Sequence, residues 1–182
     1  MIEFIKKELF IFLVMGCIYT NIELVFRGFT HPSMLVVGGL CGVLIGLINN
    51  IAPNKKLYKQ CLISMVIVTC VEFISGYMLN IKMGLNVWDY SDLPFNIMGQ
   101  VSLLFSVFWF FLSIIAIWLD DYLRYKFYGE KKPNDLFIYI KYLLTFRSYR
   151  WYHIKKKGNA STTRMPFFVF IILGEYYEEY IK

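Results

Sequence analysis

The sequence predicts an all-α membrane protein, a four-helix transmembrane bundle with a C-terminal amphipathic, basic interfacial tail. Hydrophobic residues make up 58% of the 182 residues, against roughly 45–50% in soluble domains. They are gathered in long runs, and lysine and arginine around those runs bring the net charge to +6. This pattern excludes a soluble globular domain, a disordered chain and a secreted disulfide scaffold.

Four apolar runs are long enough to cross a bilayer, which takes about 20 mostly apolar residues. They cover residues 9–26, 34–51, 61–81 and 97–119. Prolines that favour turns lie between them, at Pro32, Pro53 and Pro94. We therefore expect a four-span domain at 1–122 and a tail at 123–182.

The first run has the basic start of a signal peptide, Lys6-Lys7, but no small-residue cleavage site follows it. We expect it to be a retained helix. Lysines also lie between the second and third runs and in the tail. Because cytoplasmic segments are rich in Lys and Arg, we expect a multi-pass protein of the cell membrane with both termini in the cytoplasm.

Glu72 lies near the middle of the third run, where a charge would be costly. At helical spacing it shares a face with Thr69, Gly76 and Asn80. It is either a proton- or cation-binding carboxylate beside a pathway or a protonated group that hydrogen-bonds two helices. Both alternatives stay open.

Glu23 and Arg27 are spaced for an ion pair within one helix. Such a pair could neutralise itself locally, or one member could reach Glu72 or a substrate. We expect a polar centre made of Glu72, Glu23, Arg27, Asn80 and Gln100.

Two runs carry faces of small residues. Gly38, Gly42 and Gly46 recur every four residues, which is typical of a glycine zipper where two helices approach closely. The fourth run places small and hydroxylated residues on one face, with Gln100 alongside, either for packing or as a surface that lines a substrate path. These are Gly99, Ser102, Ser106, Trp109 and Ser113.

The chain has four cysteines, none in a CxxC pair, and two histidines, His31 and His153, far apart in sequence. We expect free thiols, no metal and no cofactor. No Ser/His/Asp or Cys/His set fits nucleophilic catalysis, so we expect no enzymatic activity.

The segment 88–96, WDYSDLPFN, falls between the last two runs. Trp88 and Tyr90 suit the membrane interface. Asp92 and Pro94 favour a turn, and Asn96 is a residue type that caps helices. An anchored and capped turn on the outer side accounts for this composition.

This segment, followed by IMGQVSLLFSVFW, resembles the putative ABC-transporter type IV family of CmpB-like membrane proteins. VEFISGYMLN around Glu72 and NIELVFRGF around Glu23 support the resemblance, which covers roughly residues 10–122 and not the tail beyond Arg124. The matching positions are Glu23, Arg27, Gly28, Glu72, Trp88, Asp89, Tyr90, Ser91, Pro94, Asn96 and Gly99. The chain departs from the family pattern at Gln100, where a basic residue is usual, and at Phe110, where glycine is usual.

In the tail, Asn134 or Asp135 could cap a helix from Leu136 to about Tyr152, in which apolar and basic residues alternate. This is typical of a helix in the membrane interface. The following Lys155, Lys156 and Lys157 would contact anionic headgroups. Lipid is a nearer partner than nucleic acid, and the short apolar run 166–174 suits an interfacial or re-entrant segment.

These features favour a permease-like component of a small-solute transporter. The polar centre around Glu72 would handle the solute, and residues 88–96 would guard the outer mouth. Because the chain has no phosphate-binding loop and few spans, we expect a homo-oligomer or a separate partner subunit. A structural or regulatory membrane protein and a holin-like permeabilising protein are the alternatives.

Overall fold

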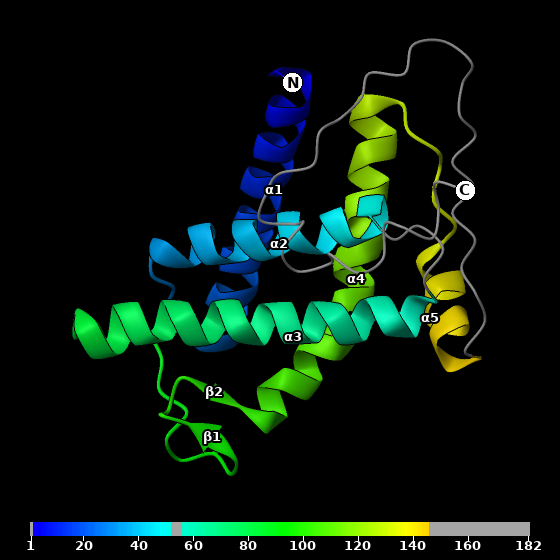
Figure 1. Cartoon of the computed structure of the whole chain (residues 1–182). Coiled ribbons are helices and arrows are strands. Elements are labelled where there is room, and N and C mark those ends of the chain that lie inside the picture. Colours follow the sequence, from blue (N-terminus) through cyan, green and yellow to red (C-terminus); the bar gives the residue numbers. More distant parts are fainter. Residues whose placement is uncertain (1, 52–55, 146–182) are drawn as a thin grey trace, which may run out of the picture. The chain divides into compact units, whose positions relative to one another are not determined.

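The computed structural model describes residues 2–51 and 56–145. The elements in order are α1 (Ile2–Arg27), α2 (Ser33–Ile51), α3 (Leu57–Gly76), the π-helix η1 (Tyr77–Lys82), β1 (Asn96–Ile97), β2 (Val101–Ser102), α4 (Leu103–Tyr128) and α5 (Leu136–Leu144) (Figure 1). The described part of the chain is thus mostly helical, as the sequence predicts.

Three helices are long and apolar enough to cross a membrane: Ile2–Arg27, Leu57–Lys82 and Leu103–Tyr128, each of 26 residues. At 1.5 Å per residue such a helix is about 39 Å long, more than the roughly 30 Å of a hydrocarbon core. The apolar part of α2 is shorter, Ser33–Ile48. A helical membrane protein is therefore supported, with one of the four predicted runs less extended than the rest.

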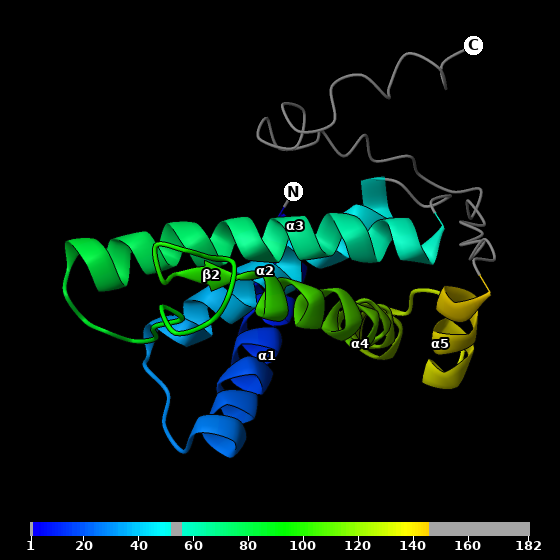
Figure 2. The ribbon, with the colours of Figure 1, turned by 90° about the horizontal axis from the view of Figure 1, so that it is seen from below.

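The long helices cross one another steeply. Figures 1 and 2 show α2 and α3 side by side, with α1 and α4 running across them. α1 packs mainly against α2, and α3 mainly against α4. This arrangement differs from the small crossing angles of a simple four-helix bundle.

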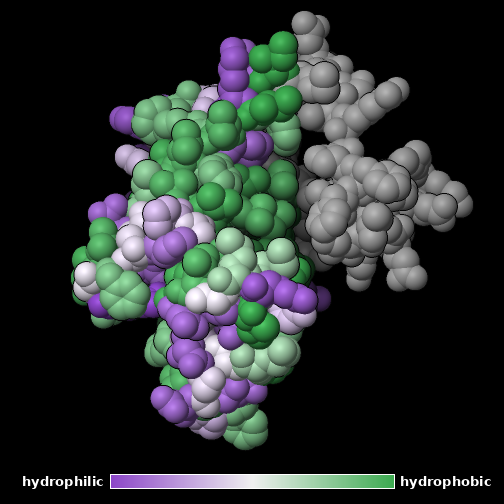
Figure 3. Space-filling view, turned by 90° about the vertical axis from the view of Figure 1, so that its left-hand side faces the viewer, coloured by the Kyte–Doolittle hydropathy of each residue, from purple (hydrophilic) through white to green (hydrophobic). Residues whose placement is uncertain are grey.

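The hydropathy of the surface differs between the upper and lower halves of this face. Seen from the left-hand side of Figure 1, hydrophobic residues cover much of the upper half, and hydrophilic residues gather toward the bottom, at the level of β1 and β2 (Figure 3). Many large apolar side chains of α1 and α4 are exposed, among them Leu9, Leu13, Phe108 and Phe111. Such exposure is expected of surfaces that face lipid.

The start predicted for the fourth helix, residue 97, is wrong. Phe95, Met98 and Gly99 have φ of 55°, 55° and 68°, a left-handed conformation that a right-handed helix cannot contain. β1 and β2 therefore pair antiparallel in a short hairpin, and α4 begins only at Leu103.

Asn96 does not cap α4, contrary to the prediction. Ser102 is the N-cap, and its hydroxyl accepts a hydrogen bond from the backbone N–H of Phe105 at 3.3 Å. At the other end α4 continues past the predicted residue 119 to Tyr128. Gly129 (φ 65°) ends it as a left-handed C-cap.

A buried ionic network joins the start of α1 to the end of α4. Arg124, which is 2% exposed, donates to both carboxylate oxygens of Glu8 at 3.0 Å and to Asp120 Oδ2 at 2.7 Å. Lys7 pairs with Glu130 nearby. Arg124 gives the two buried carboxylates a counter-charge, while Asp120 Oδ1 is buried without a hydrogen-bond partner among the described residues.

α5 packs on α3 and α4. Tyr139 and Leu143 are buried there, and the Tyr139 hydroxyl donates to Asp121 at 2.7 Å. The helix starts at Leu136 as predicted, and Asp135 is its N-cap without a side-chain hydrogen bond. Residues 146–152 of the predicted helix, Lys155–Lys157 and the run 166–174 lie outside the described residues.

The spaced glycines of α2 lie at close contacts. A Cβ on Gly38 would fall 2.5 Å from Tyr19 Cβ, and one on Gly42 2.5 Å from Met15 Cβ, both on α1. Gly46 faces the Asp120 carboxylate of α4. Because glycine has no side chain, these positions allow α2 to pack closely against α1 and α4.

We predict that Arg124→Ala lowers the free energy of unfolding by about 3–5 kcal/mol, because it leaves Glu8 and Asp120 buried without a counter-charge. Unfolding in mixed micelles measures this. The control is Lys6→Ala, whose pair with Glu3 is exposed (66% and 87%) and contributes about 0–1 kcal/mol. Equal effects of the two changes would contradict a structural role for the network.

We predict that Gly42→Leu destabilises the protein by about 1–3 kcal/mol, because the new side chain overlaps Met15 and forces α1 from α2. The same unfolding assay applies. Val36→Leu adds bulk at a position of α2 that is 54% exposed and should change stability by less than about 0.5 kcal/mol. A Gly42→Leu protein as stable as Val36→Leu would refute the close approach.

Candidate functional site

Glu72 is a carboxyl group enclosed by three parts of the chain. It lies on α3 and is 6% exposed. Its Oε1 accepts a hydrogen bond from the Tyr90 hydroxyl at 3.0 Å, and its Oε2 accepts one from Trp109 Nε1 at 2.9 Å. Tyr90 comes from the segment 83–102 and Trp109 from α4, so the carboxyl group connects α3 to both.

The Tyr90 side chain points toward α3 and α4. Its ring stacks on Phe105 with centroids 4.4 Å apart. Burial, and then the nearby Glu72 carboxylate, raise the pKa of the Tyr90 phenol. The phenol therefore keeps its proton and remains a hydrogen-bond donor.

Trp88 is also buried, at 6% exposed, so the prediction that it anchors at the interface is wrong. Its Nε1 donates to the backbone carbonyl of Gln100 at 2.9 Å. A buried indole N–H needs such a partner, and this bond closes the hairpin over the end of α3.

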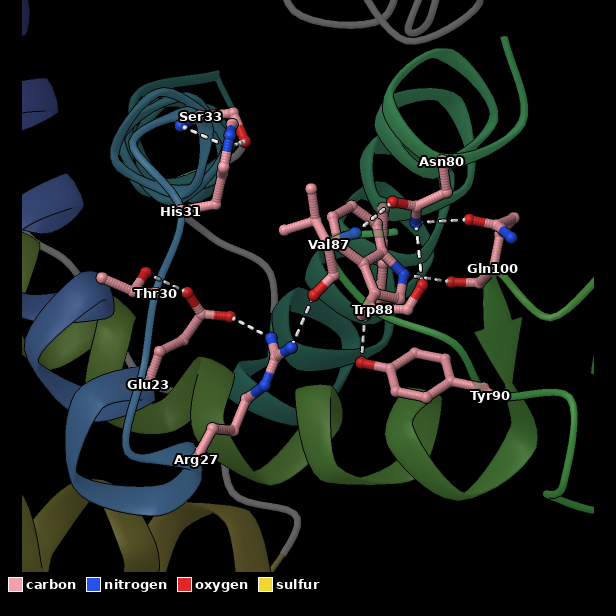
Figure 4. Close-up of polar contacts among 11 residues, drawn as sticks. Glu23, Arg27, Thr30, His31, Ser33, Asn80, Val87, Trp88, Tyr90 and Gln100 are labelled. Carbon is pink, nitrogen blue, oxygen red and sulfur yellow. Dashed lines mark hydrogen bonds and ion pairs between the residues drawn. The ribbon is translucent and has the colours of Figure 1, made fainter. Parts of the chain in front are cut away.

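Asn80 in η1 is the hub of this segment (Figure 4). Its side-chain nitrogen donates to the carbonyl of Trp88 at 2.9 Å and to Gln100 Oε1 at 2.8 Å. Its Oδ1 accepts the backbone N–H of Val87 at 2.7 Å. The structure thus brings Asn80 and Gln100 together, and with a neutral Gln100 the pair carries no charge.

Glu23 and Arg27 form the spaced pair that the sequence indicates, with Arg27 Nη1 2.9 Å from Glu23 Oε1. The Thr30 hydroxyl donates to the other carboxylate oxygen. Arg27 Nη2 donates to the carbonyl of Val87 at 2.6 Å (Figure 4). The pair therefore holds the start of the segment 83–102, and among its recorded bonds none reaches Glu72.

The residues of the predicted polar centre therefore form two separate hydrogen-bonded groups, and both groups contact the segment 83–102. Glu23, Arg27, Asn80 and Gln100 fix the backbone around Val87 and Trp88, whereas Glu72 binds the Tyr90 side chain of the same segment.

The motif residues beyond Tyr90 fold the tip of the segment. Asp89 Oδ1 accepts hydrogen bonds from the Ser91 N–H at 2.8 Å and from its hydroxyl at 2.6 Å. The Ser91 hydroxyl, and then its N–H, lower the pKa of the Asp89 carboxyl. A Cβ on Gly99 would fall 2.6 Å from Asp89 Oδ1, so glycine is needed there for space as well as for φ.

Asn96 completes the tip. Its nitrogen donates to the carbonyls of Ser91 and Leu93 at 3.1 and 2.8 Å, and its Oδ1 accepts the N–H of Gly99 at 3.0 Å. Pro94 lies inside the turn that these bonds close. The role of Asn96 is therefore to close the turn and not to cap a helix.

A cavity of about 160 Å³ lies beside Glu72. Side chains of all four long helices line it, with Trp88 at one edge, and almost all of them are apolar. Glu72 is its charged group. Sequence reasoning singled out Glu72 but missed Tyr19, which lines the cavity, and did not foresee Trp109 Nε1 as a donor.

In residues 2–51 and 56–145, no group of three or more His, Cys, Asp or Glu could hold a metal ion. Cys17, Cys41, Cys61 and Cys70 are free thiols.

The fold and site are those of a helical membrane protein with a carboxyl group buried among its apolar helices. Residues 10–149 match the family described as "Putative ABC-transporter type IV", and the chain belongs to that family. The resemblance drawn from the motifs is confirmed, but its expected end was wrong, because the match continues beyond Arg124 and through α5.

The other two comparisons add no relative. The search of curated proteins and the search of solved structures each found no match.

We predict that acid opens the tip of the segment 88–96. Because the pKa of Asp89 is lowered by folding, its stabilising effect is present above the unfolded pKa of about 3.9 and is lost as the pH falls through the folded pKa. Amide exchange of Ser91 should accelerate relative to its intrinsic rate on acidification.

Ser91→Ala should move this transition to higher pH, since it removes the hydroxyl bond to Asp89. Ser113→Ala is the control, because that hydroxyl bonds the Trp109 carbonyl within α4. Equal transitions in both variants would show that the Ser91 hydroxyl does not stabilise the Asp89 carboxylate.

Proposed function

We propose that this protein is a membrane-embedded, permease-like component of a transporter for a small solute, with Glu72 as its polar centre. One observation carries the proposal. Glu72 is buried at the wall of a cavity, and both of its recorded donors, Tyr90 and Trp109, are neutral. A carboxyl group inside a membrane is by default a candidate for a substrate or ion path.

The segment 83–102 would be the outer cover of this site. Trp88 lines the cavity, and Tyr90 binds the carboxyl group directly. Because Asn80 and Arg27 hold the backbone on either side of Val87, a movement of this cover would be transmitted to Glu72 through Tyr90.

We propose that the four long helices, α2 included, lie within the bilayer at different tilts, because α1 and α4 run across α2 and α3, and that both termini face the cytoplasm. The pairs of Lys7 with Glu130 and of Glu8 with Arg124 put the start of α1 and the end of α4 at one end of the described unit. The contact of Arg27 with Val87 puts the cover at the other end. The lysine-rich segments favour the cytoplasm for the first of these ends.

α5 would lie at the cytoplasmic headgroups. Its buried face holds Tyr139 and Leu143, while Phe137, Ile140 and Leu144 are exposed at helical spacing. An exposed apolar stripe next to Lys141 suits the interface. We propose lipid as the partner of α5. We also propose that a further copy of the chain or a separate ATPase subunit supplies the rest of the transporter, and that this chain has no enzymatic activity.

The alternative is a structural membrane protein in which Glu72 only locks helices together. The bonds from Tyr90 and Trp109 to the two carboxylate oxygens favour it, because they would persist with a protonated carboxyl group.

We predict that Glu72→Gln abolishes transport and leaves membrane insertion intact, since glutamine keeps the size and one acceptor but removes the charge. The assay compares the solutes retained by cells that lack the gene with those of cells that express each variant, by mass spectrometry of cells and medium. A solute whose distribution wild type restores and Glu72→Gln does not would support the permease.

Glu3→Gln is the control, because it makes the same chemical change at a side chain that is 87% exposed, and it should transport normally. Full transport by Glu72→Gln refutes the proposal. A Glu72→Gln protein that no longer inserts into the membrane also refutes it and favours the structural alternative. Host lysis on expression would refute it in favour of a holin.

A further inference from the structure

We infer that the cavity beside Glu72 binds an organic ammonium ion with an apolar body. This specifies the substrate class of the proposed function and rests on that function for its transport step. The binding itself follows from the lining, the opening and the charge of the cavity.

The lining selects an apolar body. Met15, Val37, Ile45, Val68 and Ala116 contribute side chains from all four long helices, and Gly38 and Gly42 add bare backbone that is already in contact with α1. Burying hydrocarbon among such residues is favourable by roughly 0.8 kcal/mol per methylene group. A sugar or an amino acid would lose its hydrogen bonds to water here with few replacements.

The exposed part of the cavity wall is apolar, so we expect its opening to face lipid. The wall residues that are exposed lie on the outer flanks of two helices: Ile18 and Ile22 of α1 at 37% and 40%, and Leu112 and Ile115 of α4 at 39% and 47%. α1 and α4 meet at a few positions, among them Glu8 with Arg124 and Tyr19 with Trp109. A ligand that partitions into the bilayer can therefore enter from the side.

The charge selects a cation. Among the described residues of the lining, Glu72 is the acidic one, and none is lysine, arginine or histidine. Each of its oxygens accepts one recorded hydrogen bond from a neutral donor, Tyr90 or Trp109, and a carboxylate oxygen can accept more than one. An ammonium ion would supply the missing counter-charge, whereas an anion would be repelled.

Aromatic rings complete an ammonium site. Tyr19 and Trp109 both line the cavity with ring centroids 6.0 Å apart, and Trp88 lines it as well. Ring faces attract cations, and cages of such rings recognise alkylated ammonium groups. A carboxylate among three aromatic residues therefore indicates the head of the ligand, and the aliphatic wall its tail.

The volume of the cavity limits the length of the ligand's apolar tail. The cavity of about 160 Å³ is close to the roughly 150 Å³ of a dry engineered cavity that takes up benzene. An amine with about six carbon atoms fills such a space.

The test uses the full chain in lipid nanodiscs with three probes of one length: hexylamine, hexan-1-ol and hexanoate. Isothermal titration calorimetry measures binding, and empty nanodiscs correct for partition into lipid. We expect hexylamine to bind at least about tenfold more tightly than either of the others, a difference of about 1.4 kcal/mol. Glu72→Gln should reduce hexylamine to the affinity of hexan-1-ol.

A second variant tests whether the ligand occupies the cavity, independently of the ligand's charge. Ala116→Leu fills the cavity from α4 and should weaken hexylamine and hexan-1-ol by the same factor. This variant decides the outcome if Glu72→Gln fails to fold, as judged by its melting temperature. Hexylamine binding that Ala116→Leu leaves unchanged overturns the inference.

Hexan-1-ol or hexanoate binding as tightly as hexylamine also overturns it, as does a Glu72→Gln protein that keeps the preference for the amine. The two proposals fail separately. No amine preference together with Glu72-dependent transport would remove only the substrate class, and amine binding with Glu72-independent transport would remove only the proposed function.

Discussion

The cost of placing a carboxyl group among apolar helices governs the arrangement around Glu72. None of the described residues in the wall of the adjoining cavity is a base, and the group is bound by donors from elsewhere in the sequence, Tyr90 and Trp109. Asn80 and Arg27 hold the backbone at Val87, in the same segment as Tyr90. The hydrogen bonds of Glu72, Asn80 and Arg27 together connect α1, α3, η1 and α4 to the segment 83–102.

Where α1 starts and α4 ends, buried carboxylates are compensated in a different way. There Arg124 pairs with two acids, Glu8 and Asp120, so a positive charge within the protein offsets part of their negative charge. The contrast is informative, because a group that is compensated internally has no need of a ligand. Glu72 has neutral partners, which is what makes it the candidate for a role beyond stability.

Composition and periodicity were enough to predict the helices, because long apolar runs admit few other structures in a membrane. The pairing of Glu23 with Arg27 could likewise be predicted from spacing alone. The hairpin could not, since the left-handed residues Phe95 and Met98 give no compositional signal inside an apolar run. Contacts across the fold, such as Asn80 with Gln100 or Glu8 with Arg124, depend on how the helices cross, which no local pattern contains.

The π-helix at the end of α3 has a consequence for variation among related chains. Its backbone bonds span five residues, so the angular step between side chains changes after Gly76. One continuous helix can therefore aim Glu72 at the cavity and Asn80 at the hairpin. Substitutions along residues 77–82 would keep this register, but the loss or gain of a single residue would swing Asn80 away from Val87 and uncouple the two ends of the helix.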